Sequence, residues 1–249
     1  RSFADWPHWL AEKVQRKNIT DLICYGDCRP YHREAITALQ ALGVRVHVLE
    51  EGYLRPNWIT CEPGGVNGNS SLTRINLDGI DAARIAEPAA DTEVELHGAH
   101  WHYMMSGFAH YFWTFLLTPL FPRYISHRDL DILGEAALWL ERFGSWPMRR
   151  SRTRKALKAV DHSRRPVHLV LLQLNGDSQL REHSSFQSVR HFVEYCVAEY
   201  AASGMADSVL VFKNHPLDNG VVNLGRVVRE EAEKHGLADR VFFVDSGKL

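Results

Sequence analysis

The sequence is poor in cysteine and nearly free of net charge. Its 249 residues include four cysteines, with no Cys-x-x-Cys pair, and the formal net charge is −1. This cysteine pattern excludes a disulfide-dense scaffold and favours a reducing compartment. The balanced charge gives no reason to expect nucleic acid as a partner.

Long apolar runs are absent as well. No segment reaches the length of about 18 apolar residues that a spanning helix needs, and residues 1–10 lack the apolar core of a signal peptide. With 45% hydrophobic and 24% charged residues, the composition is that of an ordinary globular protein. The chain begins at Arg1 and stops just after a predicted strand, so we expect a fragment that lacks a C-terminal portion.

The first part of the chain has the pattern of a βαβ unit. Residues 6–17 predict a helix and residues 21–25 a short buried strand. A second helix is expected to start at Pro30, where a missing N–H costs nothing, and to run to Leu42. Residues 44–49 predict the next strand, and this spacing favours a parallel pair.

A second series with the same pattern occupies the end of the chain. Strands are predicted at residues 167–172, 208–212 and 240–244, with helices at about 187–202 and 222–235 between them. Strands alternating with helices indicate another parallel sheet.

The middle of the chain is less regular. Residues 55–100 are rich in loop-forming residues, and residues 130–143 have helical periodicity. The apolar, aromatic segment 107–122 predicts either a buried helix or an element that lies in a membrane interface. Residues 149–165 hold eight Lys or Arg and one acid, Asp161, which fits a solvated helix face or a lipid-binding surface.

Together these patterns predict an α/β protein with two Rossmann-like halves. We expect an acceptor-side domain at residues 1–125, a basic helical connector at 126–165 and an incomplete nucleotide-sugar domain at 166–249. Two such halves facing a cleft are typical, by analogy, of the GT-B glycosyltransferase architecture.

Two polar segments follow predicted strands of the second half, at residues 173–177 and 213–216. Ligands of open α/β sheets bind outside the carboxyl ends of the strands, so we expect one site built from both segments. Asp177 is a candidate nucleophile or base, or it caps a helix start. Gln173 is placed to bind a sugar hydroxyl or to satisfy backbone groups.

The segment 213–216 carries Lys213, His215 and Pro216. Proline keeps the residue before it out of the helical region, so His215 is presented at the end of the strand. Lysine and histidine there form a candidate phosphate clamp. The alternative is a turn with a surface histidine.

A further set of polar residues follows the strands of the first half: Asp27, Arg29, His32, Glu50, Glu51 and Arg55. Paired acids such as Glu50 and Glu51 can divide the roles of acid and base, or can form a charge pair in solvent. Arg29 and His32 lie at a helix N-terminus, which favours anions, while Asp27 is a candidate N-cap. Arg55 is a candidate group for a polar acceptor.

No metal site is predicted. His97, His100 and His102 are close in the chain, but their spacing fits no zinc signature and no Cys or carboxylate pattern completes it. No other cofactor is expected.

Three motifs in combination resemble the capsule polysaccharide biosynthesis proteins of the KpsS/LipB type. They are Glu-Glu-Gly-Tyr-Leu-Arg-Pro at residues 50–56, Gln173-x3-Asp177-x6-Ser184 and Lys213-x-His215-Pro216. The resemblance spans about residues 20–245. It implies a retaining β-Kdo transferase that uses CMP-β-Kdo as the donor substrate.

The resemblance also implies roles, partners and a location. Asp177 would be the nucleophile, and Gln173 and Ser184 would position the donor sugar. Lys213 and His215 would bind the CMP phosphate or stabilise it as it leaves, and Pro216 would belong to the same donor-binding set. The pair Glu50 and Glu51 would serve the acceptor side. The acceptor would be phosphatidylglycerol or lyso-phosphatidylglycerol at the cytoplasmic face of the inner membrane, where other capsule assembly proteins are expected partners.

Two other functions remain open from the sequence. One is a different nucleotide-sugar transferase or an epimerase of similar fold, which donor choice would separate from a Kdo transferase. The other is a non-catalytic export or assembly factor of the capsule machinery.

Overall fold

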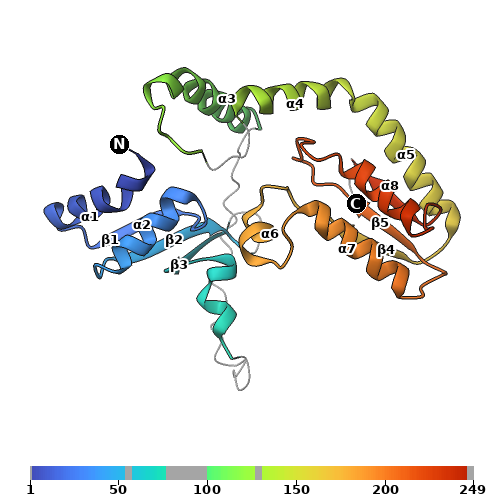
Figure 1. Ribbon diagram of the computed structural model, residues 1–249, viewed down its shortest axis with the longest axis horizontal. Coiled ribbons are helices and arrows are strands. Elements are labelled where there is room, and N and C mark those ends of the chain that lie inside the picture. The colour runs from blue at the N-terminus through green and yellow to red at the C-terminus, as the bar shows by residue number, and fades with distance from the viewer. Residues whose placement is uncertain (1, 54–57, 77–99, 127–130, 246–249) are drawn as a thin grey trace. The chain divides into compact units, whose positions relative to one another are not determined.

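The chain divides into two compact units, Arg1–His127 and Arg128–Leu249 (Figure 1). The computed structural model describes residues 2–53, 58–76, 100–126 and 131–245. Each unit holds a three-stranded sheet with helices packed against it. The predicted α/β class is therefore confirmed.

The first unit begins with the predicted βαβ elements. After a short 3-10 turn, η1 (Phe3–Asp5), come α1 (Trp6–Lys17), β1 (Asp21–Tyr25), α2 (Pro30–Gln40) and β2 (Arg45–Glu51). The strands β1 and β2 are parallel neighbours, as predicted.

The sheet of the first unit is mixed, because a third strand was not predicted. β3 (Ile59–Pro63) runs antiparallel to β2, within a segment whose composition indicated loops, and the 3-10 turns η2 (Asn67–Asn69) and η3 (Ser71–Arg74) follow it. The alternation of apolar and polar residues that marks a half-buried strand is not visible in the sequence of β3. The buried position carries Glu62, whose carboxylate accepts hydrogen bonds from the hydroxyls of Tyr53 and Ser70.

One face of this sheet is covered and the other is not. The covered face is closed by Ile36 of α2, Val46 and Val48 of β2, and Val66 from the loop after β3. On the opposite face, Ile23 is 67% exposed and Ile59 is 69% exposed. The core of the first unit therefore lies on the α2 side of the sheet.

The aromatic segment forms α3 (His100–Leu117) and the 3-10 turn η5 (Thr118–Leu120). Its large side chains are exposed, Phe108 at 65% and Trp113 at 55%, so the buried-helix interpretation is wrong. In the described part of the chain, no helix combines the length and the apolar character that crossing a bilayer demands.

The second unit contains a parallel sheet in the order β4-β5-β6. Its elements are α4 (Ile132–Gly144), α5 (Trp146–Ser163), β4 (Val167–Leu171), α6 (Ser178–His183), α7 (Val189–Ala202), β5 (Val209–Lys213), α8 (Leu224–Lys234) and β6 (Val241–Val244). The predicted strands and the helices α4, α7 and α8 are confirmed, with boundaries shifted by a few residues at most. Helix α6 is an addition to the predicted series.

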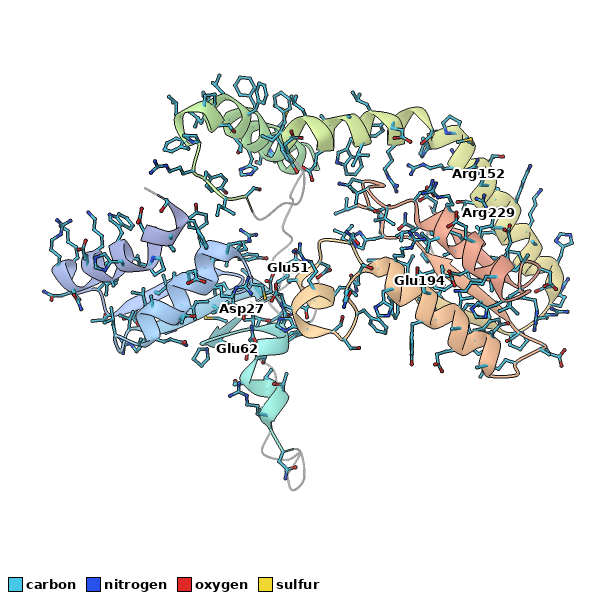
Figure 2. All side chains as sticks on the ribbon, in the orientation of Figure 1. Asp27, Glu51, Glu62, Arg152, Glu194 and Arg229 are labelled. Carbon is cyan, nitrogen blue, oxygen red and sulfur yellow. The ribbon has the colours of Figure 1, made fainter. Side chains whose placement is uncertain are left out.

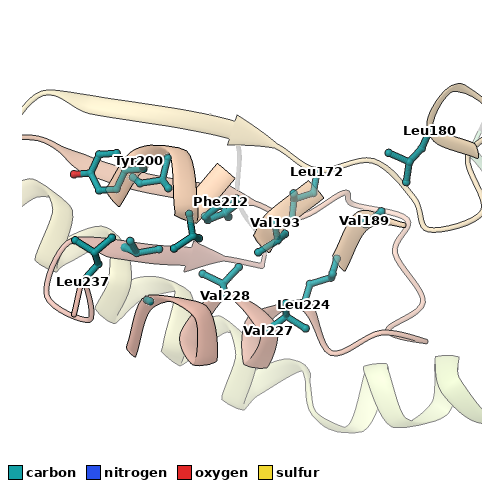
Figure 3. Packing of buried hydrophobic residues seen from close by; sticks show 14 residues of the cluster. Leu172, Leu180, Val189, Val193, Tyr200, Phe212, Leu224, Val227, Val228 and Leu237 are labelled. Carbon is teal, nitrogen blue, oxygen red and sulfur yellow. The ribbon is translucent and has the colours of Figure 1, made fainter. Parts of the chain in front are cut away.

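Helices cover both faces of this sheet. On one face, Phe212 of β5 packs with Val193 of α7 and Val228 of α8 in the larger core cluster (Figure 3). Because successive strand residues point to opposite faces, Val211 points the other way, where Val160 of α5 packs against it. The basic helix α5 is thus part of the packed second unit.

We expect Gly52→Ala to destabilise the first unit. A Cβ added at Gly52 would lie 2.5 Å from the backbone oxygen of Trp58, and the N–H of Gly52 donates to that same oxygen at 2.7 Å. Opening the connection between β2 and β3 to relieve this clash should lower the free energy of unfolding by roughly 1–3 kcal/mol. Urea denaturation followed by circular dichroism measures the change.

The matched control is Gly107→Ala in α3, where a Cβ would meet nothing within 4 Å. A helical Gly→Ala change in open space should leave stability unchanged or raise it by up to about 1 kcal/mol. Equal stabilities of the two variants would contradict the steric argument at Gly52.

Candidate functional site

Two of the predicted polar segments lie at the same edge of the second unit's sheet. β4 and β5 are parallel neighbours with Leu171 opposite Lys213, so their carboxyl ends lie side by side. Residues 173–177 follow β4, and residues 214–216 follow β5. The structure therefore brings both segments to neighbouring strand ends, as predicted.

Asp177 is the N-cap of α6, which confirms the capping interpretation. Its Oδ1 accepts the N–H of Gln179 at 2.8 Å. Among the described residues, no donor is hydrogen-bonded to its Oδ2, and the side chain is half-buried. One carboxylate oxygen thus holds the helix start while the other is available to a ligand.

Ser184 forms hydrogen bonds within the protein, whereas Gln173 is exposed to solvent. The hydroxyl of Ser184 donates to the carbonyl of Leu180 and accepts the N–H of Phe186 at 3.1 Å, which ends α6. Gln173 is exposed. A sugar-binding role for either residue stays a prediction.

Lys213 and His215 present hydrogen-bond donors at the end of β5. The Lys213 side chain is buried and its Nζ donates to the carbonyl of Asn214 at 3.1 Å, while no carboxylate of the described residues lies within ion-pair distance. Nδ1 of His215 accepts the N–H of Leu217 at 3.1 Å, so the ring proton belongs on Nε2. A buried ammonium and an imidazole N–H suit an anion such as a phosphate.

Asn214 fixes the position of this loop, and the sequence did not indicate its role. Its amide nitrogen donates to Asp218 at 3.0 Å and to Asp245 at 2.8 Å, while its oxygen accepts the N–H of His215 at 3.0 Å. Asp245 directly follows β6, the same kind of position as the predicted site residues. A search for polar residues at every strand end would have found it.

Two arginines from the helices preceding the sheet complete this cluster. Arg142 of α4 lies 3.5 Å from Asp218 and 3.7 Å from Asp245. Nε of Arg149 lies 3.3 Å from Oδ2 of Asp245, close enough for an ion pair but not aligned for a hydrogen bond. Burial lowers the pKa of Arg149, although an arginine remains charged at any physiological pH. The two carboxylates are therefore neutralised within the protein.

A cavity of about 600 Å³ opens beside this cluster within the second unit. Leu224 and Val228 of α8 and Met148 of α5 supply apolar surface, and Arg152 and Arg229 line it from the same two helices (Figure 2). Much of the remaining lining is charged, including Glu141 and Glu233, and neither Asp177, Lys213 nor His215 is part of it.

In the first unit, two of the predicted polar residues, Glu50 and His32, lie next to Gly26 at the end of β1. A Cβ at Gly26 would lie 3.5 Å from the Glu50 carboxylate, and Nδ1 of His32 lies 2.8 Å from the Gly26 carbonyl. Glu51 follows on β2 and is exposed (Figure 2). The pKa of Tyr25 is raised by burial and by the neighbouring Glu50 and Glu51. This is an acidic strand end, and Arg55 lies outside the described residues.

Asp27 has a structural task in the first unit. Its Oδ2 accepts the N–H of Val66 at 3.0 Å and the amide of Asn69 at 3.1 Å, which ties the loop after β3 to β1. Burial raises the pKa of Asp27, but these hydrogen bonds and one from the Cys28 thiol outweigh it and leave the pKa below its ordinary value. The N-cap of α2 is Arg29, so the interpretation of Asp27 as that cap is wrong.

The histidines considered for a metal give no further support. His97 lies outside the described residues, and the structure gives no side-chain placement for His100. Within the described ranges, no group of three or more His, Cys, Asp or Glu residues is placed to hold a metal ion.

Comparison with known proteins identifies the family of the chain. The family model described as "Capsule polysaccharide biosynthesis protein" matches residues 20–249. The chain belongs to this family. It is 31% identical over 246 residues to the capsule polysaccharide export protein KpsS of Escherichia coli, covering 96% of this chain and 61% of KpsS.

The second relative is the capsule polysaccharide modification protein LipB of Neisseria meningitidis serogroup A. It is 28% identical over 252 residues, covering 96% of this chain and 58% of LipB. The chain therefore spans about 60% of the length of these curated relatives. No solved structure matches the chain.

The basic side chains of α5 do not all face solvent. Arg150 and Arg154 of α5 are exposed, which fits a solvated or lipid-facing helix side, whereas the exposed Arg152 lines the cavity. Arg149 belongs instead to the cluster around Asp245. Arg149 therefore does not fit the lipid-binding interpretation of residues 149–165.

We expect Arg149→Gln to destabilise the second unit. Removing this guanidinium leaves Asp245 with less compensation in a largely buried place, which should lower the free energy of unfolding by roughly 3 kcal/mol. Arg154→Gln on the exposed side of the same helix is the control and should change it by no more than about 0.5 kcal/mol. Urea titrations of both variants measure the difference, and equal midpoints would contradict a structural role for Arg149.

Proposed function

We propose that the protein is a β-Kdo transferase of capsule polysaccharide synthesis. It moves Kdo from CMP-β-Kdo to a lipid of the phosphatidylglycerol type and so starts the linker that carries the polysaccharide. The observation that carries this proposal is that the segments holding Asp177 and the pair Lys213 and His215 follow neighbouring parallel strands, in a chain of the capsule polysaccharide biosynthesis family.

The proposed first step uses the unpaired oxygen of Asp177. Oδ2 attacks the anomeric carbon of Kdo, a carbon–oxygen bond forms, and the bond from that carbon to the phosphate oxygen of CMP breaks. The departing phosphate takes the bond's electron pair. Lys213 and the Nε2–H of His215 stabilise this charge, because both groups are donors and no described carboxylate pairs with the lysine.

In the proposed second step, the acceptor hydroxyl attacks the same carbon and releases Asp177 as a carboxylate. The hydroxyl proton passes to a general base. Glu50 and Glu51 stay the proposed acceptor-side groups. Two displacements at one carbon retain its configuration. Gln173 and Ser184 are the proposed contacts of the donor sugar.

The inner face of the inner membrane is the proposed site of action, since a lipid acceptor resides in a bilayer. Other capsule assembly proteins are proposed partners there. A second candidate, a non-catalytic export factor, is favoured by one observation: the relative KpsS is named an export protein. The two candidates differ in whether loss of the Asp177 charge stops Kdo transfer.

We expect Asp177→Asn to abolish transfer without unfolding the protein. Asparagine caps helices as well as aspartate does, so α6 should keep its start, whereas the neutral amide cannot form the glycosyl-enzyme. The transfer rate should fall by roughly 10³-fold or more. The assay supplies CMP-Kdo made in situ and a fluorescent phosphatidylglycerol analogue to the full-length protein, with products read by mass spectrometry.

The control is Asp207→Asn, an exposed carboxylate before β5, which should keep the wild-type rate. Wild-type transfer by Asp177→Asn would refute its role as nucleophile. No product from the folded wild-type protein would favour either the export factor or another donor. Thermal-shift measurements with CMP-, UDP- and GDP-linked sugars would then separate those two outcomes.

A further inference from the structure

A continuous set of large apolar side chains is exposed on α3 and η5. We call it the aromatic surface. Each member is between 48% and 71% exposed: Phe108, Phe112, Trp113, Phe115, Leu116, Leu120 and Phe121. Soluble monomers rarely expose so many neighbouring large apolar groups without a binding role.

The helix is apolar on most of its circumference. From residue 105 onward, Gly107, Tyr111 and Thr114 alone among the described positions of α3 are partly covered. They share one narrow side of the helix because they are spaced four and three residues apart. A helix that is apolar nearly all round requires an apolar environment on the other sides.

The polar groups within this segment are already satisfied locally. The hydroxyl of Thr114 donates to the carbonyl of His110 at 2.7 Å, and the hydroxyl of Thr118 donates to the carbonyl of Thr114 at 2.7 Å. Hydroxyls bonded back to their own helix do not need water. This arrangement suits contact with hydrocarbon, where an unpaired polar group is costly.

The charge pattern fits an anionic surface. Residues 96–128 contain no Asp or Glu, and Arg123 lies two residues after Phe121. Arg123 is near Asp5, whose pKa is lowered by hydrogen bonds from Ser2 and also by the Arg123 charge. Acidic side chains would be repelled by anionic headgroups, and a nearby arginine is attracted to them. Tryptophan and tyrosine, both present in α3, are enriched where a protein meets the headgroup level of a bilayer.

The end of the segment is fastened to the first unit. Tyr124 stacks on Tyr31 of α2 with ring centroids 5.8 Å apart, and the N–H of Ile125 donates to the Tyr31 hydroxyl at 3.4 Å. The Trp6 indole N–H donates to the Tyr31 carbonyl at 2.9 Å. The segment that carries the aromatic surface is therefore connected to α1 and α2 by direct contacts.

We propose that the aromatic surface docks the protein onto an anionic lipid bilayer, with α3 lying in the interface and not crossing it. The inference deepens the proposed function, since it rests partly on a lipid acceptor and names the surface that reaches it. Docking itself requires neither a donor sugar nor Asp177, so the two proposals can fail separately.

The test is flotation of the full-length protein with vesicles of phosphatidylcholine and phosphatidylglycerol. We expect the double variant Phe112→Gln, Phe115→Gln to partition at least roughly tenfold more weakly, because it replaces two apolar side chains that would be buried in the bilayer. The matched control, Ile19→Gln with Leu42→Gln, changes two exposed apolar side chains elsewhere in the first unit and should float like the wild type. Far-UV circular dichroism confirms that each variant is folded.

Three outcomes would overturn the proposal. They are a wild-type protein that does not float, a double variant that floats as well as the wild type, and a double variant that changes the oligomeric state in light scattering while flotation is unaffected. The last outcome would assign the surface to a second copy. Asp177→Asn should float normally whether or not it transfers Kdo, and the double variant should retain transfer to a detergent-dispersed acceptor, which separates a docking failure from a catalytic one.

Discussion

The geometry of the second unit depends on a group of buried side chains in which the positive and negative charges balance. Asp218 and Asp245 lie in places that desolvate them, and they are compensated by Arg142, Arg149 and the Asn214 amide. Removing one member would leave an opposite charge buried alone, which costs more than the pair gains. Because Asn214 also accepts the N–H of His215, this balance holds the loop between Lys213 and Asp218 in one conformation. The positions of the candidate phosphate-binding groups follow from it.

Function and local structure share the same hydrogen bonds in this protein. Asp177 uses one oxygen to start α6 and leaves the other available, and His215 uses Nδ1 to hold its own loop and leaves Nε2–H available. Such sharing fixes the direction of each available group without further contacts. It also means that a side chain can be both the structural cap and the candidate reactive group, so the two interpretations of Asp177 are compatible.

Much of the fold could be predicted because the buried strands and amphipathic helices follow regular periods. The βαβ units around β1 and β5 are examples. β3 could not be predicted, since its buried position carries Glu62, and the roles of Asp27 and Arg149 depend on partners 39 and 96 residues away in the chain. The sequence indicated which strand ends carry polar groups. It could not indicate that α4 and α5 supply their counter-charges, because a charged residue on a helix has the same pattern whether it faces solvent or a carboxylate.

The packing of α5 also bears on the order of folding. The β4-α7-β5-α8-β6 series is closed by contacts that are near in sequence, whereas the hydrogen bond from the Asp245 N–H to the Thr153 hydroxyl spans 92 residues. Closing a long loop costs entropy that only later contacts repay, so α5 is expected to join last. Until α5 joins, Asp218 and Asp245 remain hydrated. Both carboxylates therefore lose their water in the final step of folding. The barrier of that step should therefore respond to ionic strength more than the earlier assembly of the core does.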